Sequence, residues 1–216
     1  MKQQVLTMLS MQDSMNRKVH PQWIAQQFEW YRAVWIECAE LMDHYGYKWW
    51  KQQQPDIEQV RLEIVDIWHF GMSAMFAPEL SIEALAERIV ADIESAAGQT
   101  AGGHNVREAT EALAEHSLQS QGFSVAHFWQ LLLAADMDFD TLYVAYVGKN
   151  VLNFFRQDHG YKEGSYIKQW AGREDNEHLV EICAGLDAGA SDFRDQVYAA
   201  LSARYQSLCL DASAAS

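Results

Sequence analysis

Apolar residues recur at intervals of three and four along most of the chain, which is the spacing of amphipathic helices. Alternation of apolar and polar residues is weak, and no stretch gives a convincing hairpin signal. Only three prolines and twelve glycines interrupt the 216 residues. We therefore predict an all-α fold, with helices over residues 4–17, 21–45, 55–76, 81–97, 105–119, 124–135 and 139–159, a further helix that opens at residue 173, and a last helix over 191–208.

Two acidic pairs stand inside this apolar pattern, Glu37 with Glu40 and Glu63 with Asp66. A spacing of three places two carboxylates side by side on one helix face. On a helical wheel the first acid of each pair lies about 60° from the centre of the apolar stripe of its helix, and the second acid lies about 120° from it. The two pairs are therefore placed alike on their helices. The pairs therefore form either two solvated helix edges or the walls of a shared cleft. In a cleft, four carboxylates would repel one another unless a hard cation such as Mg²⁺ lay between them.

Composition and charge limit the possible classes of function. With 49% hydrophobic residues and eight tryptophans the chain is not disordered, and its length fits one compact domain or a domain with an inserted subdomain. The net charge of −14 argues against binding of nucleic acid, which favours a basic face. No apolar run approaches the roughly 20 residues of a membrane helix, and no signal peptide is evident. Three widely spaced cysteines suggest neither disulfides nor zinc, so we expect a cytoplasmic protein without a membrane partner.

Two groups of residues are suited to contact with a base. Gln12 and Asn16 lie one helical turn apart, and their amides offer both donors and acceptors to a base edge. Trp49 and Trp50 stand between two lysines, an arrangement that suits stacking on a base beside an anion. The amides could equally be ordinary solvated side chains, and the tryptophans a plug in the core.

A basic stripe lies on the predicted helix over 139–159. Lys149, Asn153 and Arg156 share one face of this helix, and together they offer a point charge, an amide and a bidentate fork to a phosphate chain. The loop over 160–172 follows directly and is dense in glycine, aromatic residues and lysine, a composition more typical of functional loops than of structural ones. A solvated polar stripe is the alternative interpretation of the three helical residues.

Taken together, these segments resemble the dimeric, all-α dUTPases, a branch of the all-α NTP pyrophosphohydrolase superfamily that includes MazG-like enzymes. The superfamily pattern of E-x-x-E followed by E-x-x-D is present at 37–40 and 63–66. The dUTPase branch adds Lys-Asn-x-Leu-Asn, Arg-Gln and Gly-Tyr-Lys, which begin here at residues 149, 156 and 160. The matching segments follow the family's order as far as about residue 176, whereas residues 80–135 carry no matching motif.

The resemblance implies a fold and an activity. The fold is a helical bundle, and family members form homodimers. The Gly-rich turn between the predicted helices over 81–97 and 105–119 suggests in addition that residues 81–135 form a mobile helical cap or insert, while residues 1–80 and 136–216 form a rigid core. The activity is hydrolysis of dUTP, and of dUDP, to dUMP with release of pyrophosphate or phosphate, assisted by two or more Mg²⁺ ions. The alternatives are the same reaction on another nucleotide, such as dCTP or a non-standard NTP, and a non-catalytic nucleotide-binding dimer.

The resemblance also implies a role for individual residues. The catalytic residues and Mg²⁺ ligands would be Glu37, Glu40, Glu63 and Asp66, with Glu37 or Glu40 accepting the proton of the attacking water. Gln12 and Asn16 would read the uracil edge, the basic residues would hold phosphates, and Asn176 would contact the sugar–phosphate region. The complete set implied to bind substrate is Gln12, Asn16, Trp49, Trp50, His69, Lys149, Asn153, Arg156, Tyr161, Lys162, Lys168 and Asn176.

Overall fold

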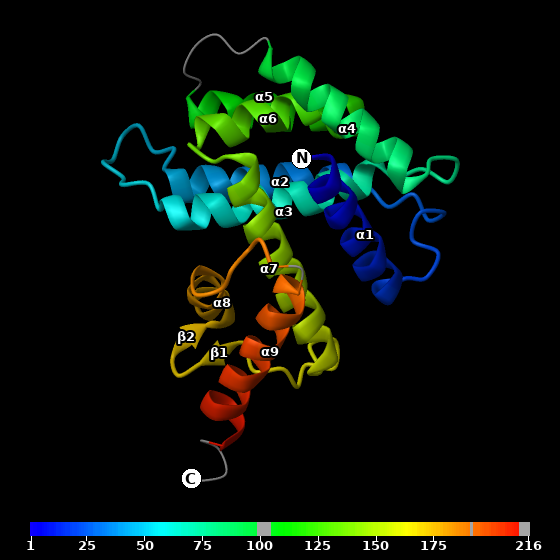
Figure 1. The fold of residues 1–216 in the computed structure, drawn as a ribbon. Coiled ribbons are helices and arrows are strands. Elements are labelled where there is room, and N and C mark those ends of the chain that lie inside the picture. The colour runs from blue at the N-terminus through cyan, green and yellow to red at the C-terminus, as the bar shows by residue number, and fades with distance from the viewer. Residues whose placement is uncertain (99–104, 191, 212–216) are drawn as a thin grey trace. The chain divides into compact units, whose positions relative to one another are not determined.

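The computed structural model of the protein describes residues 1–98, 105–190 and 192–211. Helices account for most of these residues, and only two strands of two residues each occur among them, which confirms the all-α class (Figure 1). The chain divides into two compact units, Met1–Leu142 and Tyr143–Ser216. The predicted division into a rigid core and a mobile cap over 81–135 concerns motion, and it stays a prediction. No helix of the described residues combines the length and the apolar character needed to cross a bilayer.

The first unit is built from two layers of helices. α2 and α3 lie side by side, and α4, α5 and α6 form a second layer over them, while α1 packs against α3 and α4 (Figure 1). These elements are α1 (Lys2–Val19), α2 (Trp30–Tyr45), α3 (Ile57–Met75), α4 (Ile82–Ala97), α5 (Val106–Ser120) and α6 (Val125–Ala134). Each corresponds to a predicted helix, and most bounds differ by one or two residues, as expected where helix ends fray.

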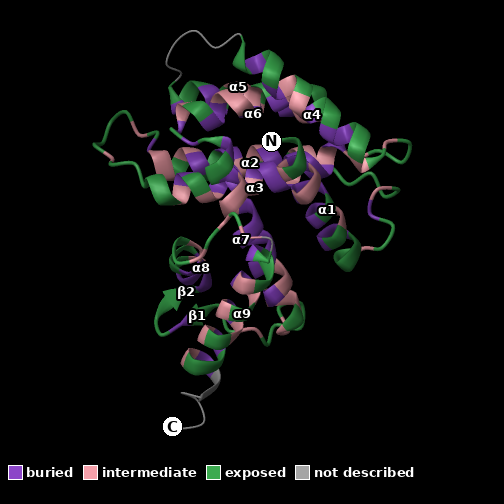
Figure 2. Ribbon diagram, viewed as in Figure 1, coloured by how far each residue is buried: buried purple, intermediate pink, exposed green. Residues whose placement is uncertain are grey.

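α3 forms the centre of this unit, and Figure 2 shows buried residues along much of its length. Trp68 is fully buried and stacks on Phe128 of α6 with a centroid distance of 4.7 Å. Burial of large aromatic side chains of this kind stabilises the fold by about 1.5–3 kcal/mol each. Gly71 permits close packing at the next turn, because a Cβ placed there would come within 2.4 Å of the Phe123 ring. α3 is therefore held rigidly under the second layer.

Helix ends follow signals that the sequence carries. Asp56 precedes α3 and its Oδ1 accepts a hydrogen bond from the backbone N–H of Gln59. Ser81 and Ser124 cap α4 and α6 in the same way. Gly46 ends α2 with a φ of 91°, a conformation that glycine adopts without strain. These caps fix where α2 ends and α3 begins, and so set the register of the two helices.

The predicted helix over 21–45 is too long at its N-terminal end, because α2 begins only at Trp30. Residues 21–27 form consecutive turns with hydrogen bonds between residues three apart, and Gln27 has a φ of 50°. A tertiary contact explains the turns: Trp23 is buried, and its indole N–H donates to Asp13 of α1 at 3.0 Å. Burial of this indole against α1 overrides the local helical pattern.

The second unit contains the rest of α7 (Phe139–Asp158), which begins at the end of the first unit, and two further helices, α8 (Asp175–Ala184) and α9 (Phe193–Tyr205). A π-helical turn over Gln206–Asp211 follows α9. Residue 191, where the last helix is predicted to begin, lies outside the described residues.

The second unit also holds a small hairpin that the sequence pattern does not predict. β1 (Gln169–Trp170) and β2 (Arg173–Glu174) pair in antiparallel fashion across Ala171 and Gly172, both with positive φ. The prediction that a helix opens at residue 173 is therefore wrong by two residues, since α8 begins at Asp175. Strands of two residues span only one period of apolar–polar alternation, so they leave no repeating pattern to detect.

Candidate active site

Three carboxylates from two neighbouring helices converge in the first unit. Glu37 of α2 and Glu63 and Asp66 of α3 each offer a carboxylate oxygen, and these oxygens all lie within 4.8 Å of one another. Glu63 is buried, whereas Glu37 and Asp66 are partly exposed. These three acids therefore lie together in a shared, partly solvent-accessible cluster and are not separate solvated helix edges.

The cluster has a strong electrostatic consequence for Glu37. Burial, followed by the charges of Asp66, Glu63 and Glu40, raises the pKa of Glu37 to about 8. A hydrogen bond between Glu37 and Glu63 contributes in the same direction. Without a cation the cluster therefore retains a proton at neutral pH. A hard divalent cation among these oxygens would replace that proton and offset the repulsion.

Glu40, the fourth predicted acid, is exposed and is not part of the three-carboxylate group. It is still near enough to act on Glu37, although it is the last of the causes that raise the pKa of Glu37. One residue that the sequence reasoning missed lies closer to the cluster: Nε2 of His44 is 3.4 Å from Oε1 of Glu63. The spacing could have shown it, because His44 follows Glu37 by seven residues and Glu40 by four, and so lies near their face of α2.

The predicted base readers form a buried network between α1 and α3. The Gln12 amide nitrogen donates to Asn16 Oδ1 at 3.0 Å, and Gln12 Oε1 lies 2.8 Å from His69 Nδ1. The Asn16 amide nitrogen donates to the Ser73 hydroxyl at 2.9 Å, and that hydroxyl donates to the backbone carbonyl of His69 at 2.9 Å. The alternative of solvated surface amides is wrong, because all four residues are buried. Ser73 was missed, although it follows His69 by one helical turn.

Trp49 and Trp50 lie in the loop between α2 and α3 and point largely to solvent. Trp49 is 90% exposed and Trp50 60%, and with Tyr47 they form an edge-to-face aromatic cluster. The alternative that these two tryptophans plug the core is therefore excluded. An arginine of α5 supports the start of this loop, because Arg107 Nε donates to the Gly46 carbonyl at 2.7 Å.

In the second unit the basic stripe is anchored by an acid that the sequence reasoning did not single out. Arg156 of α7 makes two hydrogen bonds of 2.8 Å to the carboxylate of Asp175, which is fully buried at the start of α8. Tyr166 donates to the same carboxylate at 2.8 Å. Burial, and then the charge of Asp175, raise the pKa of Tyr166, so its hydroxyl stays protonated. The Arg156 fork is therefore oriented by Asp175, and its remaining nitrogen lies 3.3 Å from Asn153 Oδ1.

The other predicted phosphate binders of this unit differ in exposure. Lys149 is buried, with 8% exposure, so the stripe on α7 is not a purely solvated one. Tyr161, Lys162 and Lys168 are exposed, and Lys168 pairs with Glu174 at 3.2 Å. Asn176 lies at the start of α8 with its Oδ1 buried, and no described group hydrogen-bonds to that oxygen.

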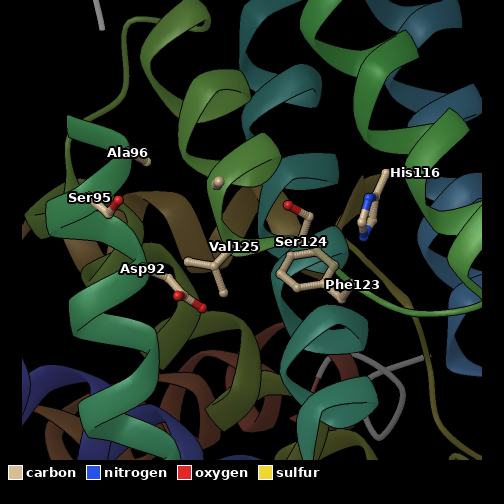
Figure 3. A pocket seen from close by; sticks show the side chains of 8 residues that line it. Asp92, Ser95, Ala96, His116, Phe123, Ser124 and Val125 are labelled. Carbon is tan, nitrogen blue, oxygen red and sulfur yellow. The ribbon is translucent and has the colours of Figure 1, made fainter. Parts of the chain in front are cut away.

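A separate pocket of about 280 Å³ lies between α4, α5 and α6 of the first unit. Figure 3 shows Asp92 and Ser95 on α4, His116 on α5, and Phe123, Ser124 and Val125 where α6 begins. None of the predicted site residues lines it. Among the described residues, the lining acid and imidazole do not belong to a cluster of three or more candidate metal ligands. The catalytic chemistry is therefore sought at the carboxylates of α2 and α3.

Comparison with known proteins agrees with this geometry. No protein in the curated set matched the chain. The family model described as dUTPase, in contrast, matches residues 4–161, a segment that begins in α1 and includes all four predicted acids. This match covers well over half of the 216 residues. The chain therefore belongs to the all-α dUTPase family and is a dUTP diphosphatase, an enzyme that hydrolyses dUTP.

Proposed function

We propose that this enzyme hydrolyses dUTP, and also dUDP, to dUMP in a Mg²⁺-dependent reaction, with release of pyrophosphate or phosphate. One observation carries the proposal, the convergence of Glu37, Glu63 and Asp66 within 4.8 Å. Burial and the repulsion between these carboxylates together raise the pKa of Glu37 to about 8. A site of this kind suits a divalent cation, which the triphosphate chain of the substrate would also bind.

The donor set fits Mg²⁺ in its chemistry. All three groups offer oxygen ligands, which Mg²⁺ prefers, and no cysteine belongs to the group. Glu37, Glu63 and Asp66 would hold the metal, with Glu40 as a further ligand. When bound, Mg²⁺ supplies charge that offsets the phosphate oxygens and lowers the pKa of a nearby water.

The proton of the attacking water requires an acceptor, and we propose Glu40 or Glu37 for this role. Glu40 is exposed on the turn that follows Glu37, so its carboxylate is accessible to water as well as to the cation. Glu37 is the alternative, because its carboxylate is partly exposed and lies one turn before Glu40. No covalent nucleophile is required.

We assign the substrate contacts by residue type. Gln12 and Asn16 would read the uracil base, with Trp49, Trp50 or His69 as a wall of the pocket. The phosphate chain and sugar would be held by Lys149, Asn153, Arg156, Tyr161, Lys162, Lys168 and Asn176, because these residues offer charged or amide hydrogen-bond donors. The buried amide network supports the first assignment, and the orientation of Arg156 by Asp175 supports the second.

Further parts of the proposal concern the whole protein. We propose a cytoplasmic homodimer in which residues 81–135 move as a cap over a rigid core formed by residues 1–80 and 136–216. Three free cysteines support a reducing compartment. Exposed aromatic side chains at Tyr47, Trp49 and Trp50 support burial of apolar surface against a partner or a substrate.

The test is product release from dUTP and dUDP with Mg²⁺ and with EDTA, for the native enzyme and for Glu37→Gln and Glu63→Gln. We expect each substitution to lower kcat by about 100-fold or more, because each removes a charge that offsets the transition state. Glu58→Gln is the matched control, since Glu58 is an exposed acid of the same helix α3. Full activity of Glu37→Gln or Glu63→Gln, or full activity in EDTA, would show that the metal site is assigned wrongly.

A panel of dUTP, dCTP, dTTP and dATP tests the base assignment. We expect kcat/KM to be highest for dUTP by a wide margin. Equal turnover of dCTP or of another nucleotide would favour a pyrophosphohydrolase of different specificity. Binding of nucleotide without any turnover would favour the non-catalytic dimer.

A further inference from the structure

We propose that Ser73 is a specificity-determining residue, which fixes the donor–acceptor direction of the amide network and so favours uracil over cytosine. This inference rests on the proposed role of Gln12 and Asn16 as base readers. Ser73 is 2% exposed on α3, and it connects that helix to Asn16 of α1.

The direction of the network follows from one group that can only accept. The backbone carbonyl of His69 has no proton, so the Ser73 hydroxyl must donate to it at 2.9 Å. The single hydroxyl proton is then in use, and Ser73 can only accept from Asn16. Asn16 must therefore present its amide nitrogen to Ser73, at 2.9 Å, and its oxygen on the opposite side.

The orientation of Asn16 also determines the donors and acceptors of Gln12 and His69. Asn16 Oδ1 accepts from the Gln12 amide nitrogen at 3.0 Å, so Gln12 must present Oε1 to His69 Nδ1 at 2.8 Å. Nδ1 of His69 therefore carries the proton, and in the neutral ring Nε2 is the acceptor. Reversal of one amide would leave two acceptors or two donors face to face, so the network has one consistent order.

This order of donors and acceptors favours uracil over cytosine. The Asn16 amide nitrogen carries two hydrogens, and Ser73 accepts only one of them, so Asn16 meets a base as a donor. Uracil offers two carbonyl acceptors that flank an N–H, whereas cytosine replaces one carbonyl by an amino donor. A donor held by Ser73 therefore matches uracil and opposes the amino group of cytosine. If the Asn16 amide were free to turn, its oxygen could accept from that amino group.

The experiment compares Ser73→Ala with the native enzyme in steady-state kinetics on dUTP and dCTP. We expect the ratio of kcat/KM for dUTP to kcat/KM for dCTP to fall by about tenfold or more, while kcat for dUTP changes by less than about threefold. Thr110→Val is the matched control, because Thr110 is equally buried and its hydroxyl likewise donates to a backbone carbonyl four residues earlier, at 2.7 Å. It should lose stability without loss of selectivity. Ser73→Thr, which keeps a hydroxyl, should retain most of the ratio.

A second measurement distinguishes a change in the direction of the hydrogen-bond network from a general loss of stability. Nitrogen-15 NMR of the imidazoles reports which ring nitrogen of His69 carries the proton. We expect the Nδ1–H form in the native enzyme and a mixture of tautomers in Ser73→Ala at a pH where the ring is neutral. An unchanged nucleotide ratio in a folded Ser73→Ala protein would overturn the proposal, whichever tautomer His69 adopts.

Asn16→Ala distinguishes failure of this inference from failure of the proposed function. If Asn16→Ala lowers the dUTP-to-dCTP ratio and Ser73→Ala does not, the base site stands and the role of Ser73 is wrong. If Asn16→Ala leaves the ratio unchanged, the base site itself is wrong, and the selectivity assigned to Ser73 is overturned with it.

Discussion

At the scale of single residues, Glu37 shows how a cluster of carboxylates conflicts with stability. Its carboxyl group is partly buried and faces the acids of α3, so the folded protein holds its proton to a pKa of about 8. In the unfolded chain the same group has an ordinary acid pKa of about 4.3. The difference between the two states makes the stability of the metal-free protein depend on pH.

The sign of this dependence follows from the raised pKa. The contribution of Glu37 to stability is fully present below about pH 4 and is lost as the pH rises through about 8. We expect a loss of about 1–2 kcal/mol between pH 5.5 and 8.5 in EDTA, a value reduced from the full shift because solvent screens a half-exposed group. Urea unfolding at the two pH values measures it.

Glu37→Gln serves as the control for this prediction. Glutamine resembles the protonated acid and cannot ionise, so the substitution should remove this part of the pH dependence. It should also make the metal-free protein more stable than the native one at pH 8.5. If the pH dependence of Glu37→Gln equals that of the native protein, Glu37 does not hold the raised pKa described above.

The four acids also show which part of the site the sequence could predict and which part it could not. The spacing of Glu37, Glu63 and Asp66 on two apolar helices allowed a shared cleft as one of two alternatives, and it did not exclude two solvated edges. Equal wheel offsets, however, gave Glu40 the same place as Asp66, and Glu40 is exposed whereas Asp66 belongs to the cluster. A wheel describes one helix in isolation, and the difference arises from how α2 and α3 pack.

At the scale of elements, the absence of a side chain at Gly71 lets α3 pack under the Phe123 ring. A methyl group at Gly71 would approach that ring to 2.4 Å, so the ring would have to move. We expect Gly71→Ala to lower the free energy of unfolding by about 1–3 kcal/mol, because overpacking outweighs the helix propensity of alanine, about 1 kcal/mol. Chemical denaturation measures the effect.

Two further variants test the cause of this effect. Gly98→Ala, at the end of α4, should be neutral or slightly stabilising, because the nearest atoms to an added Cβ there lie at 3.6 Å. Gly71→Ala combined with Phe123→Leu should recover part of the lost stability. A neutral Gly71→Ala would mean that Phe123 yields at no cost.

The pair of Arg156 and Asp175 joins α7 to α8 within the second unit. Asp175 is fully buried, and replacement by asparagine would leave the Arg156 guanidinium without its charged partner. We expect Asp175→Asn to lower the free energy of unfolding by about 3–5 kcal/mol, as is typical when one partner of a buried ion pair is removed. Glu163→Gln, an exposed acid in the following loop, is the control and should change stability little. A loss below about 1 kcal/mol for Asp175→Asn would contradict this account.

Elements were predictable where their ends carry chemical signals. Asp56, Ser81 and Ser124 precede their helices and accept the expected hydrogen bonds, and Gly46 ends α2. The residues before α2 were not predictable in this way, because their turns depend on the burial of Trp23 against α1. Tertiary contacts of this kind leave no local pattern in the sequence.

At the scale of the whole molecule, exposed apolar surface favours association. Tyr47, Trp49 and Trp50 form an exposed cluster on a chain that otherwise buries most of its large side chains. We expect the protein in solution to have twice the chain mass of 24.7 kDa, measured by light scattering after size-exclusion chromatography. A mass equal to one chain at micromolar concentration would contradict the homodimer.

The sequence pattern predicted the all-α fold class, but it did not predict how the candidate site residues are distributed between the two units. The acidic residues and the predicted base readers lie in the first unit, and the predicted phosphate binders lie in the second. Apolar periodicity defines helices one at a time and carries no information about which helices cluster together. The family resemblance supplied the grouping that periodicity could not.

The exposure of the loop between α2 and α3 has an optical consequence. Of the eight tryptophans only Trp49 and Trp50 are exposed, while Trp23, Trp68 and Trp170 are buried. A neutral quencher such as acrylamide should therefore reach the indoles of this one loop first, and remove the red edge of the emission spectrum before the blue. The fluorescence that remains comes from the tryptophans of the packed interior. If a nucleotide or a second chain covers the loop, the quenched fraction should become smaller.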